Sequence, residues 1–286
     1  MKRVDAAASL LLGLGLMLPL AGCEIPFWNV DPLNIDGRDG GGTGKPVDYS
    51  AVMRLGVSAH ATGDLATAVS LYRRAASLAP ADPAPFVAAG NTLLQMGDFN
   101  EAIVAYQSAL TRVDREPEAL RGLARAFLMS GKPELAGQPL ALAFESTPND
   151  PKLLQLIGVA DDFVGQHEEA QARYRRGLEL LPHDRALALN LALSLALTGD
   201  FTEAVGILTP VATAPDASAR ERLTLAMIYG LQGNRQAAEQ IARHDLDHDS
   251  VQRNLAYYEN LRRLPPDARQ RAIQLLSTQL ARTSPS

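Results

Sequence analysis

The stretch YSAVMRLGVSAHATGDLATAVSLYRRAASLAPAD, residues 49–82, sets a pattern that most of the chain follows. Small and apolar residues form its skeleton, namely Leu55, Gly56, Ala59, Gly63, Ala68, Tyr72, Ala75 and Pro80. A step of 34 residues brings back the same kinds of residue, as Ala89, Gly90, Leu93, Gly97, Ala102, Tyr106 and Ala109. The register continues without an inserted residue and defines six windows: 49–82, 83–116, 117–150, 151–184, 185–218 and 219–252.

Each window predicts two helices separated by a turn. A glycine stands at the centre of every window, where it supplies the left-handed residue that ends a helix; these are Gly63, Gly97, Gly131, Gly165, Gly199 and Gly233. Asp82-Pro83 and Asp150-Pro151 place a capping acceptor before a proline suited to the first helical turn. Of all residues, 47% are hydrophobic and only 5% aromatic, which favours helix packing over strands. The sequence therefore predicts an all-α fold.

A fixed period of 34 residues with this spacing resembles the tetratricopeptide repeat, or TPR. The resemblance implies a superhelix, a solenoid of about six helix–turn–helix repeats, in which the first helix of each repeat lines a groove that binds other proteins. Such a stack needs its terminal apolar face covered, so we expect residues 253–286 to form C-terminal capping helices and a tail.

The N-terminal stretch has the features of an export signal. Lys2 and Arg3 precede an apolar run, residues 6–20, which is too short to span a bilayer and suits a signal peptide. The run ends in Leu-Ala-Gly before Cys23, the only cysteine, and this resembles a bacterial lipobox. The resemblance implies that residues 1–22 are removed and that Cys23 carries lipid. The alternative is an ordinary signal peptide followed by a chance cysteine.

The residues that follow Cys23 indicate where the mature protein would lie. Residue 24 is Glu, whereas an Asp at this position retains lipoproteins at the inner membrane in the enterobacterial family. By that resemblance we expect an outer-membrane lipoprotein that faces the periplasm. Residues 23–48 are rich in Gly and Pro and predict a flexible tether between the lipid and the repeats.

The composition and the absence of catalytic motifs narrow the function further. The net charge is −5, so no basic field favours nucleic acid. The sequence contains no nucleophile elbow, zinc-protease motif or nucleotide-binding glycine loop, so we expect no enzyme activity, no cofactor and no small-molecule substrate. His244 and His248 lie four residues apart among aspartates, but they have no third, distant ligand. A solvated turn is therefore expected there instead of a metal site.

Polar residues on the first helices of the second to fourth repeats are the candidate binding site. Asn91, Arg121 and Arg125 occupy positions used by the carboxylate clamp of chaperone-binding TPR proteins, and arginine can pair a carboxylate through two hydrogen bonds. The clamp is incomplete, because Met53 and Val57 fill its other two positions. The expected groove also includes Gln95, Lys152 and Gln155. The alternative is that the two arginines belong to an ordinary solvated helix face.

In the last two repeats the same positions are apolar: Leu189, Leu193, Leu197, Leu223, Met227 and Leu231. The segments 189–197 and 222–231, followed by Asp245-Leu246 and the run Asn-Leu-Ala-Tyr-Tyr at 254–258, resemble the TPR lipoproteins of Tad (Flp) pilus assembly, the TadD family.

That resemblance implies a non-enzymatic scaffold that helps to assemble or localise the pilus secretin, with secretin or assembly subunits as partners. A type IV pilus pilotin, a general envelope-biogenesis scaffold and a regulator of cell-wall hydrolases are the alternatives.

Overall fold

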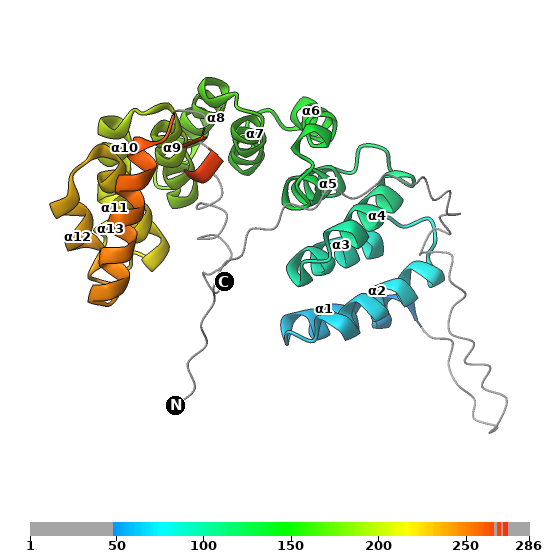
Figure 1. Cartoon of the computed structure of the whole chain (residues 1–286). Coiled ribbons are helices and arrows are strands. Elements are labelled where there is room, and N and C mark those ends of the chain that lie inside the picture. The colour runs from blue at the N-terminus through cyan, green and yellow to red at the C-terminus, as the bar shows by residue number, and fades with distance from the viewer. Residues whose placement is uncertain (1–47, 266–267, 270, 274–286) are drawn as a thin grey trace, which may run out of the picture. The chain divides into compact units, whose positions relative to one another are not determined.

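The computed structural model describes residues 48–265, 268–269 and 271–273. Every regular element in these ranges is helical, which confirms the predicted all-α fold (Figure 1). None of the helices in this part of the chain is both long and apolar enough to cross a bilayer. The predicted signal peptide, the lipidation site at Cys23 and most of the tether lie outside the described residues.

Six helix pairs follow one another along the chain, and each 34-residue window contains one pair. In each pair the first helix is called helix A and the second helix B. The pairs are α1 (Tyr49–Ala61) with α2 (Leu65–Leu78), α3 (Ala84–Met96) with α4 (Phe99–Leu110), α5 (Pro117–Met129) with α6 (Gly137–Ser146), α7 (Pro151–Phe163) with α8 (His167–Leu180), α9 (Arg185–Thr198) with α10 (Phe201–Ala212), and α11 (Ala219–Gln232) with α12 (Arg235–Ala242).

Local sequence explains where the helices begin and end. The six central glycines all have positive φ, from 75° to 97°, a conformation in which a side chain would be strained. Asp150 caps α7 by accepting a hydrogen bond from the Lys152 backbone, and Glu116 caps α5 in the same way through the Ala119 backbone. The expected turns and the cap at Asp150 are confirmed, whereas α3 begins one residue after Pro83, and Asp82 accepts a hydrogen bond from the Ala84 backbone.

Small residues let the two helices of a pair approach closely. One alanine at the same position of every helix B, or just before it, is fully buried, and these are Ala68, Ala102, Ala136, Ala170, Ala204 and Ala238. In the second pair, the ring of Tyr106 lies where a side chain on Gly90 or Gly122 would have to be. The core is therefore shared between neighbouring pairs, as in a solenoid.

The third pair departs from this regular pattern. Its helix B is split into a short 3-10 turn, η2 (Pro133–Leu135), and α6, and Pro139 lies in the first turn of α6. The missing N–H of a proline costs little in a first turn, so the proline delays the start of the helix instead of ending it early. Between α1 and α12, the contact of α6 with α7 is the smallest made by any two consecutive α-helices.

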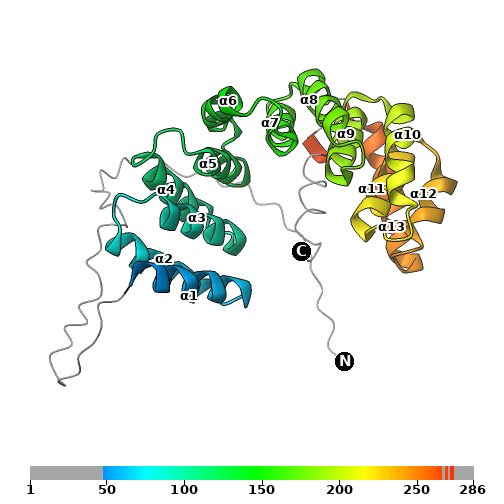
Figure 2. The ribbon, with the colours of Figure 1, turned by 180° about the vertical axis from the view of Figure 1, so that it is seen from behind.

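A capping helix follows the sixth pair. Helix α13 (His248–Arg263) lies beside α11 and α12 in Figures 1 and 2 and buries four apolar or aromatic side chains, Val251, Leu255, Tyr258 and Leu261. It contacts α11 more extensively than α12, whereas every earlier helix A contacts the preceding helix B more than the preceding helix A, so α13 is not placed as the helix A of a seventh repeat. The predicted last helix is described only at residues 268–269 and 271–273, which are helical.

Candidate functional site

The A helices of consecutive repeats contact one another from α3 through α5, α7 and α9 to α11. Their side chains at the groove positions therefore belong to one continuous surface, which we call the A-helix surface. The six predicted site residues lie on three adjacent helices of it: Asn91 and Gln95 on α3, Arg121 and Arg125 on α5, and Lys152 and Gln155 on α7.

Asn91 is held by two neighbours inside the protein. Its Nδ2 donates a hydrogen bond to Glu118 Oε1 at 3.1 Å, and its Oδ1 accepts one from the Tyr106 hydroxyl at 2.6 Å. Burial raises the pKa of the Tyr106 hydroxyl, although the positive charge of Arg125 acts in the opposite direction. Asn91 is thus fixed in orientation by the repeat that carries it.

Arg121 is also engaged. Its Nη1 lies 3.0 Å from Asp150 Oδ2 in an ion pair that is about a third exposed on the arginine side. The other carboxylate oxygen of Asp150 accepts the Lys152 backbone N–H, so one aspartate both caps α7 and joins it to α5. This pair gives Arg121 a role between repeats, and a partner carboxylate would have to compete with Asp150 for it.

The side chains of Arg125, Gln95 and Lys152 are exposed, and that of Gln155 is half-buried. Within the described residues Arg125 makes no ion pair. Three large apolar side chains are exposed at the C-terminal ends of the same helices: Met96, Met129 and Phe163. The region of α3, α5 and α7 therefore offers basic and amide groups together with accessible apolar groups. We call it the open region.

A largely buried polar cluster centred on Asp162 joins the fourth repeat to the fifth. Asp162 Oδ1 lies 2.7 Å from His167 Nδ1 and accepts a hydrogen bond from Ser194 Oγ at 2.7 Å, and Oδ2 accepts one from the Tyr174 hydroxyl at 2.9 Å. Burial raises the pKa of Asp162, and these hydrogen bonds oppose that rise. Ser194 is fully buried and donates to the carboxylate, so it is not placed as a nucleophile.

The sequence pattern alone did not indicate this cluster. The sequence did contain a signal for part of it, because Ser194 interrupts an apolar run of Leu and Ala residues and a polar residue in such a run is expected to be buried. A buried hydroxyl needs a partner. What the sequence did not show is which residue, 32 positions away, would be that partner.

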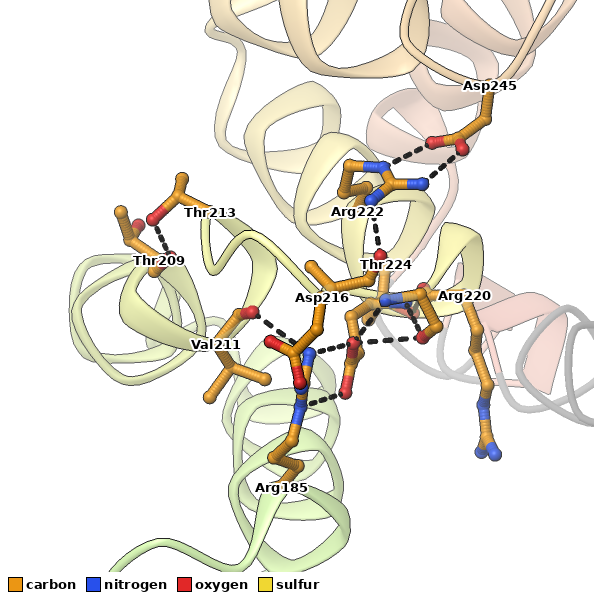
Figure 3. A network of polar contacts seen from close by, with 12 residues as sticks. Arg185, Thr209, Val211, Thr213, Asp216, Arg220, Arg222, Thr224 and Asp245 are labelled. Atoms are coloured by element: carbon orange, nitrogen blue, oxygen red, sulfur yellow. Dashed lines mark hydrogen bonds and ion pairs between the residues drawn. The ribbon is translucent and has the colours of Figure 1, made fainter.

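A second group of contacts joins the fifth repeat to the sixth (Figure 3). Arg185, at the start of α9, donates from Nε to Glu221 Oε1 at 2.8 Å and from Nη2 to Glu221 Oε2 at 2.6 Å. Its Nη1 also donates to Asp216 Oδ2 at 2.8 Å. Glu221 in turn closes a capping box with Ser218 at the start of α11.

Glu221 remains ionised in this environment. Burial opposes its ionisation, but the hydrogen bonds from Arg185 and Ser218 outweigh burial and hold the pKa of Glu221 below its ordinary value. Beside it, Arg222 pairs with Asp245 through both Nε and Nη2, which fixes the turn between α12 and α13 to α11 (Figure 3).

The acidic and histidine side chains do not gather into a metal site in the part of the chain that the structure describes. Among the described residues no group of three or more His, Cys, Asp or Glu could hold a metal ion. His244 and His248 are thus not part of such a group there. The site residues described above are suited to hydrogen bonding and ion pairing.

Comparisons with known proteins agree with this architecture. The tetratricopeptide repeat family model matches residues 38–83, 87–151 and 158–217, more than half of the chain. A TPR repeat-containing protein of Treponema pallidum is 28% identical over 159 residues, which are 56% of this chain and 20% of that protein. The chain thus spans only a fifth of that relative.

Two solved structures share the fold at low sequence identity. A tetratricopeptide repeat protein from Parabacteroides merdae has a TM-score of 0.62 and 16% identity, over 75% of this chain and 86% of that one. YrrB, described as a TPR protein with an unusual peptide-binding site, has a TM-score of 0.50 and 19% identity, over 64% of this chain and 96% of that one.

Proposed function

Because the chain belongs to the tetratricopeptide repeat family, we propose that it is a protein-binding scaffold that uses the open region of its A-helix surface. We further propose that it is an outer-membrane lipoprotein that acts in the assembly or localisation of a Tad (Flp) pilus secretin. TPR domains bind other proteins, and the fold is typically a non-enzymatic scaffold. The binding surface and the role in pilus assembly go beyond what family membership alone implies.

One observation carries the choice of surface: the open region is the part of the A-helix surface where cationic and apolar side chains are accessible together. Arg125 and Lys152 are exposed, and Met129 and Phe163 are 44% and 40% exposed on the same two helices. An exposed cation attracts an acidic group, and methionine adapts to apolar partners of different shapes. The partner segment expected here carries both carboxylates and apolar side chains.

The pilus role is supported by how the segments that resemble TadD proteins pack together. Arg222 is paired with Asp245, and the ring of Tyr258 lies against Gly230, where any side chain would collide with it. Burial raises the pKa of Tyr258 to about 12, whereas the adjacent Tyr257 ring is 42% exposed. The quoted segments therefore form one packed unit, as expected for a pattern that defines a structural family.

Crosslinking in cells tests the whole proposal. A photoreactive amino acid would be placed at Gln95 or at Met129 in the open region, and at Ala172, which is exposed on α8, as the matched control. We expect pilus secretin or assembly subunits to be crosslinked from the first two positions and not from the third. Recovery of type IV pilus or cell-wall hydrolase components instead would contradict the Tad role.

The lipid anchor has a separate test. Cys23→Ser removes the thiol that would carry lipid, so we expect the protein to move from the outer-membrane fraction to the soluble periplasmic fraction. Several buried acyl methylenes, each contributing about 0.8 kcal/mol, are what hold a lipoprotein on a membrane. If the variant stays in the outer-membrane fraction, the lipidation proposal is wrong.

A further inference from the structure

Equivalent positions of the A helices differ in exposure along the chain. Val57, Met129 and Phe163 are 57%, 44% and 40% exposed. In the sixth repeat the equivalent residues Met227 and Leu231 are 0% and 3% exposed. These two side chains are large and apolar, as their counterparts are, so other residues must cover them.

The C-terminal segment is part of what covers them. Ile273 is 1% exposed and belongs to the same apolar cluster as Met227 and Leu231, and Ala272 packs against that cluster. Leu193 and Leu197 of α9 and Leu223 of α11 pack against it too. This short segment is the red helix in Figure 1, beyond the end of α13. The chain therefore places its own residues among the apolar groove positions of the last two repeats.

Capping alone does not require this segment. Helix α13 already packs against α11 and α12, and its residues Val251, Leu255 and Leu261 are buried against the sixth repeat. Residues 268–269 and 271–273 come after Pro265 and Pro266 in the sequence, beyond the end of α13. Their apolar residues continue in the sequence as Ile273, Leu276 and Leu280, the spacing of one face of a helix.

We propose that the A-helix surface of α9 and α11 is a docking site for an amphipathic helix, and that the C-terminal segment of this chain, residues 265–286, is its occupant in cis. A helix with apolar residues at such spacing fits an apolar groove as a peptide ligand does. Because the segment is tethered directly after α13, its effective concentration at the site is of millimolar order. A partner helix reaches this surface by displacing it.

This inference rests on protein binding by the repeat fold and not on the pilus role. The test uses the full chain and a fluorescent synthetic peptide with the sequence of residues 265–286. Ile273→Glu places a charge in the apolar contact and should release the segment, whereas Arg271→Glu changes an exposed neighbour and is the matched control. We expect the peptide to bind Ile273→Glu about tenfold or more tightly than it binds the wild type or the control, by fluorescence anisotropy.

Equal peptide affinity for all three proteins would overturn the proposal. Circular dichroism checks that each variant is folded, and Ile273→Ala, a milder change, replaces Ile273→Glu if the latter does not fold. Adding Leu197→Glu to the released variant should abolish peptide binding, because Leu197 lies in the docking surface; retained binding would place the peptide elsewhere. Crosslinking from Met129 in cells does not depend on this segment. If no partner were crosslinked there, only the proposal that the open region binds a partner would be contradicted.

Discussion

The open region of α3, α5 and α7 and the surface of α9 and α11 are built from the same repeat, yet the first is exposed and the second is closed. In the first, Arg121 makes one partly exposed ion pair and Arg125 faces solvent. In the second, Arg185 binds Glu221 through two hydrogen bonds, and Met227 is fully buried. Repeat position therefore determines which side chains share a surface, but the neighbouring segments determine whether that surface is accessible.

The largest expected effect comes from the ion pair in the closed part. Glu221→Ala leaves the partly buried Arg185 without its main partner and removes a capping box, so we expect it to lower the free energy of unfolding by about 3 kcal/mol. Arg121→Ala in the open region breaks a more exposed pair and should cost about 0.5–1 kcal/mol. Urea denaturation of both variants measures the difference. Equal losses would contradict the contrast between the two regions.

A pair of glycine substitutions sharpens the same contrast. An added Cβ on Gly230 would collide with the ring of Tyr258, so Gly230→Ala should lower the free energy of unfolding by about 2 kcal/mol. Gly206, on α10, has no atom within 4 Å of the position of an added Cβ. Gly206→Ala should therefore raise the free energy of unfolding by about 0.5–1 kcal/mol through helix propensity. If both variants shifted the melting temperature in the same direction, Tyr258 of α13 would not be packed tightly against Gly230.

The contributions of Glu221 and Asp162 to stability should change with pH in opposite directions. The pKa of Glu221 is lowered in the folded protein, so its stabilising contribution is present above the ordinary value of 4.5 and is lost as the pH falls through the folded value. The stability difference between wild type and Glu221→Gln should shrink from pH 6 toward about pH 3.

The pKa of Asp162 is raised by burial, so its contribution is present below the ordinary value of 3.8 and is lost as the pH rises through the folded value. Relative to Asp162→Asn, the wild type should therefore gain stability as the pH falls over the same range. Denaturant titrations at several pH values measure both differences. If both stability differences changed with pH in the same direction, the pKa of one of the two carboxylates would be shifted in the opposite sense.

The smallest effect on stability is expected for an exposed residue of the open region. Arg125→Glu should change the free energy of unfolding by less than about 0.5 kcal/mol, because surface substitutions away from special contacts have small effects. It should nevertheless weaken the capture of an acidic partner segment, measured as the yield of crosslinks from Met129. Arg176→Glu, at an exposed arginine of α8, is the matched control. Unchanged yield in Arg125→Glu would remove Arg125 from the proposed site.

The repeat period was sufficient to predict the fold, because glycine, alanine and proline mark the turns and seams of each unit locally. The turn glycines and the cap at Asp150 followed from residues close to one another in sequence, whereas α13 begins at His248, inside the window predicted for the sixth repeat. The delayed start of α6 could not be predicted in this way, because it depends on how the chain accommodates Pro133 and Pro139 together.

The polar contacts of the candidate site were less predictable. Arg121 pairs with Asp150 and Arg185 with Glu221, in each case about one repeat away, and the sequence contains several equivalent acidic residues at similar distances. Which of them is reached depends on side-chain positions that only the packed structure defines. The clamp interpretation of Asn91, Arg121 and Arg125 stays a prediction, since the first two are held by internal partners and Arg125 alone is exposed.

The narrow contact between α6 and α7 has a mechanical consequence. In a linear array each repeat is held mainly by its neighbours, so a weak junction divides the array into two parts that can open separately. If tension is applied through the N-terminal end, the first three repeats should detach from the last three at this junction before either part unravels. A partner segment bound across α5 and α7 would bridge the junction, so a loaded scaffold should resist pulling better than an empty one.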